Sequence, residues 1–297
     1  MITKLTEVVD LVKSKPKKRL VAAFANDDHT IEAVNDAVEL DIVDAILVGD
    51  EVIIHQVCKQ LNIAPNKFTI IHEPDEMKAA TKCCDLINRN EADVLMKGAL
   101  STDKYMRAIL NKERGLCPPN ATLTHIAVFE NPAYHKLLIV GDCAIIPLPD
   151  LKQKQVILQQ IIKTAKAIGI SKPKVAIIAA TEQMSAMPAS VDAAILAKMA
   201  DRGQISGALI DGPLSLDVAV DEETARIKKM TGEVAGDADG LLFPNIESGN
   251  VFYKLSTKFN KAEVGAFLAG AKVPCVLSSR GDSSLTKLYS IAIAATL

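Results

Sequence analysis

The 297-residue sequence contains no tryptophan, and aromatic residues make up only 4% of it. Its core must therefore be built mainly from alanine, valine, isoleucine and leucine, which favours layered α/β structure. Hydrophobic residues at 49% and charged residues at 24% are ordinary for a globular protein and exclude a disordered or fibrous chain. The length exceeds what a single core usually supports, so we expect two lobes.

The sequence also lacks an excess of charge of either sign. Its formal net charge is −2, and the one dense basic cluster, residues 15–19, is too short for a nucleic-acid groove. Charged residues interrupt the N-terminal segment, so we expect neither a signal peptide nor a membrane-spanning helix. The six cysteines show no CxxC pair and no zinc-ligand spacing, which predicts reduced thiols in a cytoplasmic protein.

Four common enzyme signatures are missing as well. The sequence has no GxGxxG after a strand, no GxxxxGK[ST], no HExxH and no GxSxG. What remains are three strand-to-helix junctions rich in small, hydroxyl and charged residues. Such junctions are where an α/β sheet presents its ligand site.

Short apolar runs alternate with longer segments of helical period, which predicts a mostly parallel sheet covered on both faces. The predicted strands span residues 20–25, 45–48, 92–96, 137–140, 175–179, 207–210, 241–243 and 273–277. The predicted helices span residues 30–40, 76–88, 102–110, 151–167, 191–200, 222–230, 250–258 and 284–296. Breaks at 115–120 and 270–272 predict a first lobe of residues 1–120 plus 271–297 and a second lobe of residues 121–270.

The first junction, residues 96–103, has the composition of an anion site. Lys97 ends the predicted strand, and Ser101 or Thr102 can cap the next helix, whose free N–H groups favour an anion. Arg107 can reach back to the same place, because helical side chains lean toward the N-terminus. Two cations and a helix start make a phosphate-sized cradle, although a plain cap with surface cations fits the same residues.

The second junction, residues 278–284, holds four hydroxyls, a guanidinium and a carboxylate, more than a capping turn needs. Arg280 offers the planar fork that suits phosphate oxygens or a polarised carbonyl. Asp282 is either a base, a partner for Arg280 or a helix cap. The third junction, residues 211–214 and 232–250, has glycines that allow close approach of the backbone to a ligand, and Asn250 can cap the helix that follows.

Seven collinear strings resemble the phosphate acetyl/butyryltransferase family, and its butyryl branch in particular. They lie at residues 25–50, 92–115, 125–142, 187–193 (MPASVDA), 211–217 (DGPLSLD), 234–254 and 278–283 (SSRGDS). The resemblance implies that butyryl-CoA and phosphate give butyryl phosphate and CoA, with coenzyme A as a substrate and neither a cofactor nor a metal. It also implies a fold similar to isocitrate and isopropylmalate dehydrogenases: two α/β lobes with mostly parallel sheets around a cleft, as a homodimer or higher homo-oligomer. Neither nucleic acid nor membrane is expected as a partner.

The resemblance assigns roles to residues of the first two junctions. Arg107 matches a family arginine that holds phosphate or the phosphates of CoA, and Ser279 and Arg280 match the pair at the reacting carbonyl. With Asp282 as the candidate base, Ser279 and Arg280 form the expected catalytic set. The expected substrate-binding residues are Lys97, Ser101, Thr102, Arg107, Asn250 and Ser283.

Two positions depart from the family pattern. Acetyltransferase members carry an aspartate seven residues after the serine, where this chain has Thr286, and butyryl-type members tend to have an asparagine where this chain has Ile146. The identity of the base and the lining of the acyl pocket therefore stay open at this point.

Three alternatives remain. The first is the same chemistry with acetyl-CoA. The second is a metal-dependent decarboxylating dehydrogenase, for which Asp211, Asp237 and Asp239 would have to form a metal site, since hard cations prefer oxygen ligands. The third is a non-catalytic CoA-binding module, against which the Ser279–Arg280 pair argues.

Overall fold

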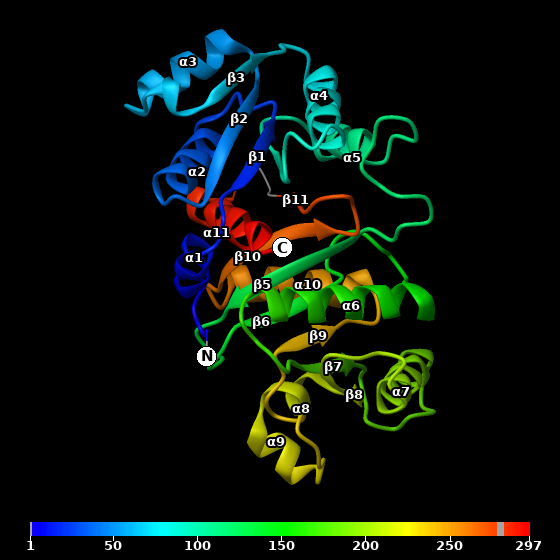
Figure 1. The fold of residues 1–297 in the computed structure, drawn as a ribbon. Helices are drawn as coiled ribbons and strands as arrows, with labels where there is room; N and C mark the ends of the chain where they lie inside the picture. Colours follow the sequence, from blue (N-terminus) through cyan, green and yellow to red (C-terminus); the bar gives the residue numbers. More distant parts are fainter. Residues whose placement is uncertain (1, 278–281) are drawn as a thin grey trace. The chain divides into compact units, whose positions relative to one another are not determined.

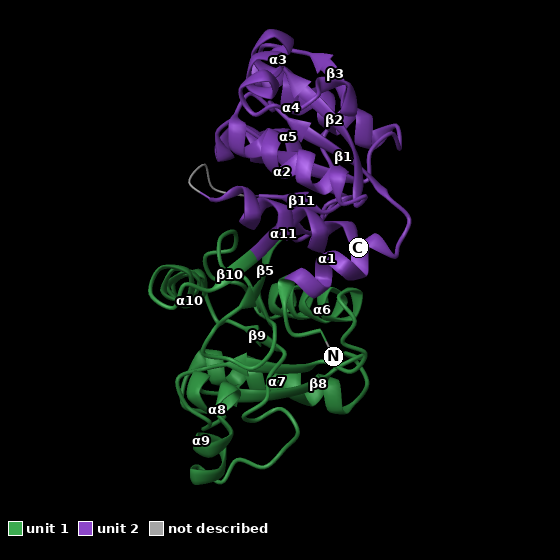
Figure 2. Ribbon diagram, turned by 90° about the vertical axis from the view of Figure 1, so that its left-hand side faces the viewer, with its two compact units in different colours: residues 1–5, 124–264 green, residues 6–123, 265–297 purple. Residues whose placement is uncertain are grey.

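The computed structural model describes residues 2–277 and 282–297, which form a mixed α/β structure with a large sheet (Figure 1). The chain divides into two compact units, coloured separately in Figure 2. Unit 1 comprises residues 1–5 and 124–264, and unit 2 comprises residues 6–123 and 265–297. The sequence places the divisions after residues 120 and 270, and the compact units divide after residues 123 and 264.

Unit 2 contains a mostly parallel part of the sheet in the strand order β3-β2-β1-β4-β11-β10. Its strands are β1 (Lys18–Ala23), β2 (Val43–Gly49), β3 (Thr69–His72), β4 (Val94–Lys97), β11 (Cys275–Val276) and most of β10 (Glu263–Ala269). Strand β1 pairs in parallel with β2 and β4, β2 with β3, and β11 with β4, whereas β10 is antiparallel to β11. Eight-residue to thirteen-residue helices connect these strands.

The helices of unit 2 lie on both sides of this sheet. They are α1 (Leu5–Lys13), α2 (Asp28–Glu39), α3 (Glu51–Gln60), α4 (Glu76–Asn88), α5 (Thr102–Ile109) and α11 (Ser284–Ala295), with a 3₁₀ turn at Pro65–Lys67. In Figure 1, α2 and α11 lie on one side of β1 and β2, and α4 and α5 on the other. Five of the helices begin after a side chain that accepts a backbone N–H of the first turn, which fixes where each helix starts. These N-caps are Asp27, Asp50, Asp75, Ser101 and Ser283.

Unit 1 contains the strand order β5-β6-β9-β7-β8. Its strands are β5 (Thr124–Glu130), β6 (Leu138–Gly141), β7 (Lys174–Ile178), β8 (Leu209–Leu214) and β9 (Gly240–Leu242). Strand β5 is antiparallel to β6, whereas β6 pairs in parallel with β9, and β7 pairs in parallel with β9 and β8. The helices are α6 (Leu151–Ala167), α7 (Pro188–Asp201), α8 (Leu216–Val220), α9 (Glu222–Ile227) and α10 (Ile246–Lys258). Figures 1 and 2 place α6 and α10 on opposite faces of the sheet of this unit.

Every strand and helix expected from the sequence occurs, and α4 and α6 have the expected bounds. The alternation of β and α predicted fewer elements than the fold contains. The elements that the sequence does not predict are strands β3, β5 and β10 and helices α1, α3 and α8. Strands β5 and β10 are not predicted because antiparallel strands interrupt the alternation of β and α. No helix in the described ranges is long and apolar enough to cross a membrane.

Tyr105 attaches α5 to the sheet in unit 2. Its side chain is fully buried, and its hydroxyl donates to the Val276 carbonyl of β11 at 3.0 Å and lies 3.4 Å from the Leu95 carbonyl of β4. Burial raises the pKa of the Tyr105 phenol well above its ordinary value, so the hydroxyl keeps its proton for this contact. One side chain therefore joins α5 to two adjacent strands.

Removing this hydroxyl should weaken the fold measurably. We expect Tyr105→Phe to lower the free energy of unfolding by about 1 kcal/mol, because buried carbonyls lose their donor while the ring still fills the core. Tyr105→Ala should cost about 3–5 kcal/mol, because it also leaves a cavity. Urea unfolding followed by circular dichroism measures both, and an unchanged unfolding midpoint for Tyr105→Phe would contradict the role of the hydroxyl.

Candidate active site

The parallel strands of unit 2 bring several strand-to-helix loops to one edge of its sheet. Strand β1 has β2 on one side and β4 on the other, so the direction of the strand order reverses between β1 and β4. The loops after β1 and β4 meet at this point: the Gly98 N–H donates to the Ala23 carbonyl at 2.9 Å, and the Ala99 N–H to the Phe24 carbonyl at 2.8 Å. Open α/β sheets bind ligands at such a reversal, outside the carboxyl ends of the strands.

Gly98 permits this close approach of the two loops. A Cβ atom at Gly98 would lie 2.4 Å from the Phe24 carbonyl oxygen and 2.7 Å from the Ala23 carbonyl oxygen. These are backbone atoms, so no rotation of a side chain would relieve the overlap. The residue after Lys97 must therefore be glycine for the loop to keep this path.

The structure gathers most of the first junction at the end of β4 and the start of α5. Lys97 is the last residue of β4, and its side chain is buried. Ser101 is the residue that caps α5, accepting the Lys104 N–H at 3.3 Å, and Thr102 is the first residue of the helix. Arg107 lies further along α5, on its exposed face.

Arg107 leans toward the start of α5, as helix geometry predicts. Its guanidinium Nε lies 3.0 Å from an oxygen of Asp103, and its side chain is 72% exposed. The structure thus shows an exposed ion pair of neighbouring turns, of a kind that contributes little to stability. The stability of the core does not depend on Arg107, so a role of this residue in binding does not conflict with folding.

The strand that precedes the second junction, β11, ends at the same edge of the sheet as β4. Strand β11 pairs in parallel with β4, with Cys275 opposite Leu95 and Val276 opposite Met96. Ser279 and Arg280 lie outside the described residues, and the structure resumes at Asp282, which is half-buried.

Ser283 caps the last helix, α11. Its hydroxyl accepts the Thr286 N–H at 3.2 Å and lies 3.2 Å from the Thr286 hydroxyl. Thr286, the residue that departs from the acetyltransferase pattern, is thus part of the helix cap. Because a threonine hydroxyl is not a base at neutral pH, Asp282 remains the carboxylate of this segment.

Lys287 is a candidate that the sequence analysis missed. It lies on α11, one turn after Ser283, and only 3% of it is exposed. Within the described ranges no hydrogen bond or ion pair engages its ammonium group, although a buried charge is costly without one. Its side chain leans toward the start of the helix, where the second junction ends. The available signal was a lone lysine at the head of an apolar run, residues 287–295.

Asn250 does not cap a helix, and the expectation that it does is wrong. Helix α10 begins at Ile246, with Asn245 as the cap that accepts the Ser248 N–H at 3.0 Å. Asn250 therefore lies in the second turn, where its side-chain amide donates to the Cys143 carbonyl at 3.0 Å. The sequence places the start of this helix too late, because Asn245 and Asn250 are both followed by residues typical of a helix.

Asn250 reaches a loop that is held by a buried carboxylate. Asp142 is 3% exposed and accepts four hydrogen bonds at 2.7–3.2 Å, which compensate its burial. The donors are the Thr124 hydroxyl and the backbone N–H groups of His125, Ala144 and Ile145. The loop after β6 is thus fixed, and Ile146 beyond it is buried.

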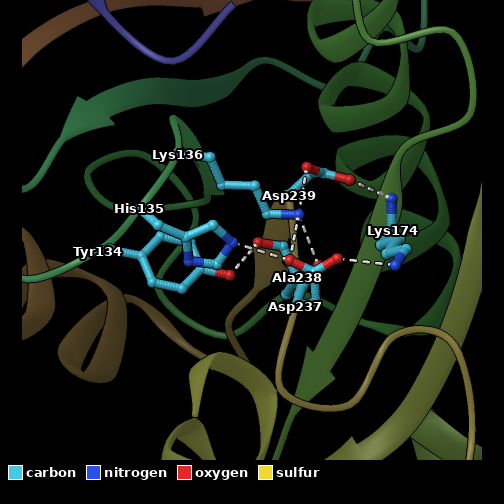
Figure 3. A network of polar contacts seen from close by, with 7 residues as sticks. All are labelled: Tyr134, His135, Lys136, Lys174, Asp237, Ala238 and Asp239. Carbon is cyan, nitrogen blue, oxygen red and sulfur yellow. Dashed lines mark hydrogen bonds and ion pairs between the residues drawn. The ribbon is translucent and has the colours of Figure 1, made fainter. Parts of the chain in front are cut away.

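The aspartates of the third junction are ion-paired rather than open to a metal. Lys136 Nζ lies 2.8 Å from both Asp237 and Asp239, and Lys174 Nζ lies 2.7 Å from Asp237 (Figure 3). His135 Nε2 is 3.0 Å from Asp237. Although burial by itself raises the pKa of Asp237, hydrogen bonds from Lys136 and Lys174 hold it well below its ordinary value. The carboxylates already have their cations.

Asp211 belongs to a different environment in unit 1. It lines a cavity of about 370 Å³ together with Asp201 and Glu233, and burial raises the pKa of its carboxyl group. Over the described residues, no group of three or more histidine, cysteine, aspartate or glutamate side chains is placed to hold a metal ion. The three aspartates that the dehydrogenase alternative requires are therefore not brought together.

Comparison with known proteins identifies the family. A model of the family described as Phosphate acetyl/butaryl transferase matches residues 3–87 and 76–295. The chain belongs to this family. It is 46% identical to a phosphate butyryltransferase of Clostridium acetobutylicum, over 99% of this chain and 98% of that one, and 38% identical to a phosphate acetyltransferase of Thermotoga maritima, over 98% of each.

A solved structure of the same kind agrees with the fold. A branched-chain phosphotransacylase from Enterococcus faecalis superposes with a TM-score of 0.81 at 29% identity, covering 94% of this chain and 99% of that chain. The family resemblance drawn from the seven strings is thus confirmed. The roles that it assigns to single residues of this transferase family member stay predictions.

The network around Asp237 and Asp239 makes a stability prediction. Lys136→Met should lower the free energy of unfolding by about 3–5 kcal/mol, because Asp239, with a side chain only 5% exposed, loses its cation. Lys198→Met is the matched control: its ion pair with Asp201 is exposed, so a change within about 0.5 kcal/mol is expected.

Urea unfolding at pH 7 compares the two variants. Equal effects of the two substitutions would contradict the buried ion pair. Because the pKa of Asp237 is lower in the folded protein than in the unfolded chain, its contribution is present above about pH 4 and is lost as the pH falls toward the folded pKa.

Proposed function

We propose that this protein exchanges coenzyme A and inorganic phosphate on a short-chain acyl group, with butyryl-CoA and phosphate giving butyryl phosphate and CoA. The observation that carries the proposal is the 46% identity to a phosphate butyryltransferase over nearly the whole of both chains. A second phosphate butyryltransferase, from Clostridium beijerinckii, is 42% identical over 97% of this chain. Phosphate acetyltransferases match at lower identity, 38% and below, so acetyl-CoA is the second candidate substrate.

The proposed site lies at the edge of unit 2 where β4 and β11 end side by side. In it Ser279, Arg280 and Asp282 do the chemistry. The substrate-binding residues proposed at this edge are Lys97, Ser101, Thr102, Arg107 and Ser283, and Asn250 of unit 1 is a further proposed substrate-binding residue. The parallel register of β4 and β11 supports this grouping for the residues of the first two junctions, because it sends both loops out at one edge.

The reaction in this proposal is a direct transfer. A phosphate oxygen attacks the acyl carbonyl, the carbon–sulfur bond breaks, and CoA leaves as a thiolate that takes up a proton. In reverse, Asp282 accepts the thiol proton so that the thiolate attacks the acyl phosphate. Each direction passes through an oxyanion on the acyl carbon, which Arg280 and Ser279 stabilise by about 3 kcal/mol per donor.

We assign Lys287 to the same site as a binding residue for an anionic group of the substrates. Its buried ammonium has no hydrogen bond or ion pair to the described protein residues, and its side chain leans toward Ser283. Phosphate and CoA both carry the charge that would compensate it. The residue therefore supplies, from the second turn of α11, a cation to the edge that already holds Lys97.

The proposal extends to the setting of the enzyme. We propose a cytoplasmic homodimer or higher homo-oligomer whose two lobes are the two compact units, with no cofactor beyond the substrate CoA. The free cysteines of the described residues, mostly buried, suit a reducing compartment. The likeness to isocitrate and isopropylmalate dehydrogenases is part of this proposal. A structure of a 4-hydroxythreonine-4-phosphate dehydrogenase from Salmonella typhimurium shares the fold at a TM-score of 0.59 and 12% identity.

The alternatives of other classes find less support. A decarboxylating dehydrogenase would need carboxylates for a metal, and Asp237 and Asp239 are paired with lysines instead. A CoA-binding module without activity would not need Ser279 and Arg280. The lysine-paired aspartates and the Ser279–Arg280 pair are both compatible with the acyltransferase proposal.

Release of the CoA thiol tests the proposed function. With phosphate present, we expect thiol release from butyryl-CoA with a higher kcat/KM than from acetyl-, propionyl- or branched acyl-CoA, and no release when phosphate is omitted. EDTA should leave the rate unchanged, because cationic side chains stabilise the charge in this proposal. Activity that EDTA removes and magnesium restores, or nicotinamide-dependent turnover, would count against it.

The assignment of Lys287 makes a separate prediction. Lys287→Met should raise the Michaelis constant for phosphate or for CoA about tenfold or more, as expected for the loss of one charged hydrogen bond. The same variant should be as stable as the wild type or more stable, because an uncompensated buried charge is replaced by an apolar chain of similar length. A purely structural lysine would give the opposite pattern, destabilisation with unchanged constants.

Three comparison variants calibrate this measurement. Arg280→Ala should lower turnover about a hundredfold, 2.7 kcal/mol at 1.36 kcal/mol per decade, because Arg280 acts on the developing charge. The exposed Lys198→Met should change neither turnover nor either Michaelis constant. Lys287→Arg should recover part of the lost affinity, since it keeps the charge.

A further inference from the structure

Two buried polar atoms at the start of α2 have no hydrogen-bond partner among the described residues. Asp27 caps this helix, and one oxygen of its carboxylate, Oδ1, accepts the Thr30 N–H at 2.9 Å. The other oxygen, Oδ2, is the first of the unpaired atoms. The second is the hydroxyl of Thr30, a residue that is only 1% exposed. Because an unpaired buried polar group costs free energy, both atoms need an explanation.

Helix capping does not explain these atoms. In a complete capping box, the side chain of the third helical residue bonds back to the backbone N–H of the cap. Helix α6 has this arrangement: Asp150 accepts the Gln153 N–H at 2.8 Å, and the Gln153 side chain accepts the Asp150 N–H at 2.9 Å. Thr30 holds the third position of α2, but its hydroxyl makes no such bond to the described chain. Asp27 Oδ1 alone caps α2, which leaves the two other polar atoms for a different partner.

The backbone just before this helix is strained. Phe24 has a φ of 57°, in the left-handed region that favours glycine. Its carbonyl accepts the Ala99 N–H, where the loops after β1 and β4 meet. Strained backbone is concentrated at ligand sites and switch regions, where surrounding structure holds it in place. Strain and unpaired polar atoms thus occur together within residues 24–30, as in a segment that binds a ligand.

The starts of α2 and α11 lie at the same edge of the sheet of unit 2. The two helices pack against each other on one side of β1 and β2 (Figure 1). Both end at the opposite edge, where β1 begins: the Lys18 N–H donates to the Ile42 carbonyl just after α2, and Thr296 at the end of α11 lines a cavity with Lys18. The first turn of α2 therefore lies at the edge of the proposed site, beside the helix start that holds Lys287.

Charge and hydrogen-bonding capacity decide which part of the substrates fits here. A carboxylate repels inorganic phosphate and the phosphates of CoA, but it accepts hydrogen bonds from neutral donors. The pantetheine arm of CoA is neutral and carries amide groups and a hydroxyl. A threonine hydroxyl both donates and accepts, so Thr30 fits either atom of such an amide. Lys97 and Lys287 attract the anionic groups, whereas Asp27 and Thr30 match the arm.

We propose that Asp27 and Thr30 bind the pantetheine arm of coenzyme A. Asp27 Oδ2 accepts an N–H or O–H group of the arm, and the Thr30 hydroxyl pairs with an adjacent amide. Because both atoms are covered in this structure, the first turn of α2 shifts as the arm enters, and binding compensates the two unpaired atoms. The inference rests on the proposed function, since it names the part of CoA that this side of the site recognises.

Substitutions that change only the unpaired atoms test the assignment. Asp27→Asn keeps an oxygen that can cap α2 and replaces the other with an amide group. It should raise the Michaelis constant for CoA about tenfold, with turnover within about twofold of the wild type. Thr30→Val should raise this constant about threefold or more and also raise the urea unfolding midpoint, because it removes a buried unpaired hydroxyl. Thr30→Ser, which keeps the hydroxyl, should stay within about twofold in affinity.

A cap in unit 1 gives the matched control. Asp150→Asn alters the same kind of cap on α6 and should change neither turnover nor the Michaelis constant for CoA. A loss of turnover without a change in this constant for Asp27→Asn would assign Asp27 to proton transfer and overturn the binding role. Unchanged constants for both Asp27→Asn and Thr30→Val would overturn it as well, while the thiol-release result of the wild type would still support the proposed function.

Hydrogen–deuterium exchange gives a measurement that needs no turnover. CoA should slow exchange of the backbone N–H groups of residues 25–31 at least about threefold in the wild type, and Asp27→Asn should weaken this effect at the same CoA concentration. The nucleotide half of CoA, without the arm, should not slow exchange there. Equal protection by the nucleotide half, or no protection of this segment by CoA, would overturn the inference. Protection by CoA without thiol release would contradict the proposed function alone.

Discussion

The parallel pairing of β4 with β1 on one side and β11 on the other is the constraint on which the candidate site depends. Parallel strands direct their carboxyl ends to one edge, so β4 and β11, which are separated by more than 170 residues in the chain, end side by side. Gly98 and Tyr105 keep the arrangement in place, one by letting two loops touch and the other by attaching α5 to both strands. A change of register would separate hydroxyls and cations that are far apart in the chain.

Burial of charge distinguishes structural lysines from candidate functional ones in this protein. Lys136 is buried but meets two carboxylates at 2.8 Å, so its charge is compensated within the fold. Lys287 is buried to a similar degree without such a contact among the described residues. The same residue type therefore stabilises unit 1 in one place and, in unit 2, is buried without a compensating partner among the described residues. Compensation, rather than burial alone, decides between these roles.

The acidic residues of unit 1 illustrate why composition is a poor guide to metal sites. The motifs that contain Asp211, Asp237 and Asp239 are rich in glycine and aspartate, and these residue types alone are compatible with a hard-cation site. In the fold, Asp237 and Asp239 pair with lysines that lie in β7 and in the segment before β6, and Asp211 lines a cavity elsewhere in unit 1. The positions of these side chains remove the support for a metal-dependent decarboxylating dehydrogenase. No local sequence pattern could reveal those positions.

The sequence alone determined the elements whose signals are local. Apolar runs and helical periods marked the strands and helices, a hydroxyl at Ser101 or Thr102 marked the start of α5, and seven short strings marked the family. Tertiary structure decided what depends on distant partners. Asn250 contacts the Cys143 carbonyl instead of capping a helix, Asp237 pairs with lysines, and Lys287 is buried without a partner among the described residues. The antiparallel strands β5 and β10 belong to the same group, because a strand is stabilised by a neighbour that its own residues do not specify. Capping and periodicity act within a few residues, whereas pairing, burial and charge compensation act between residues that only the folded chain brings together.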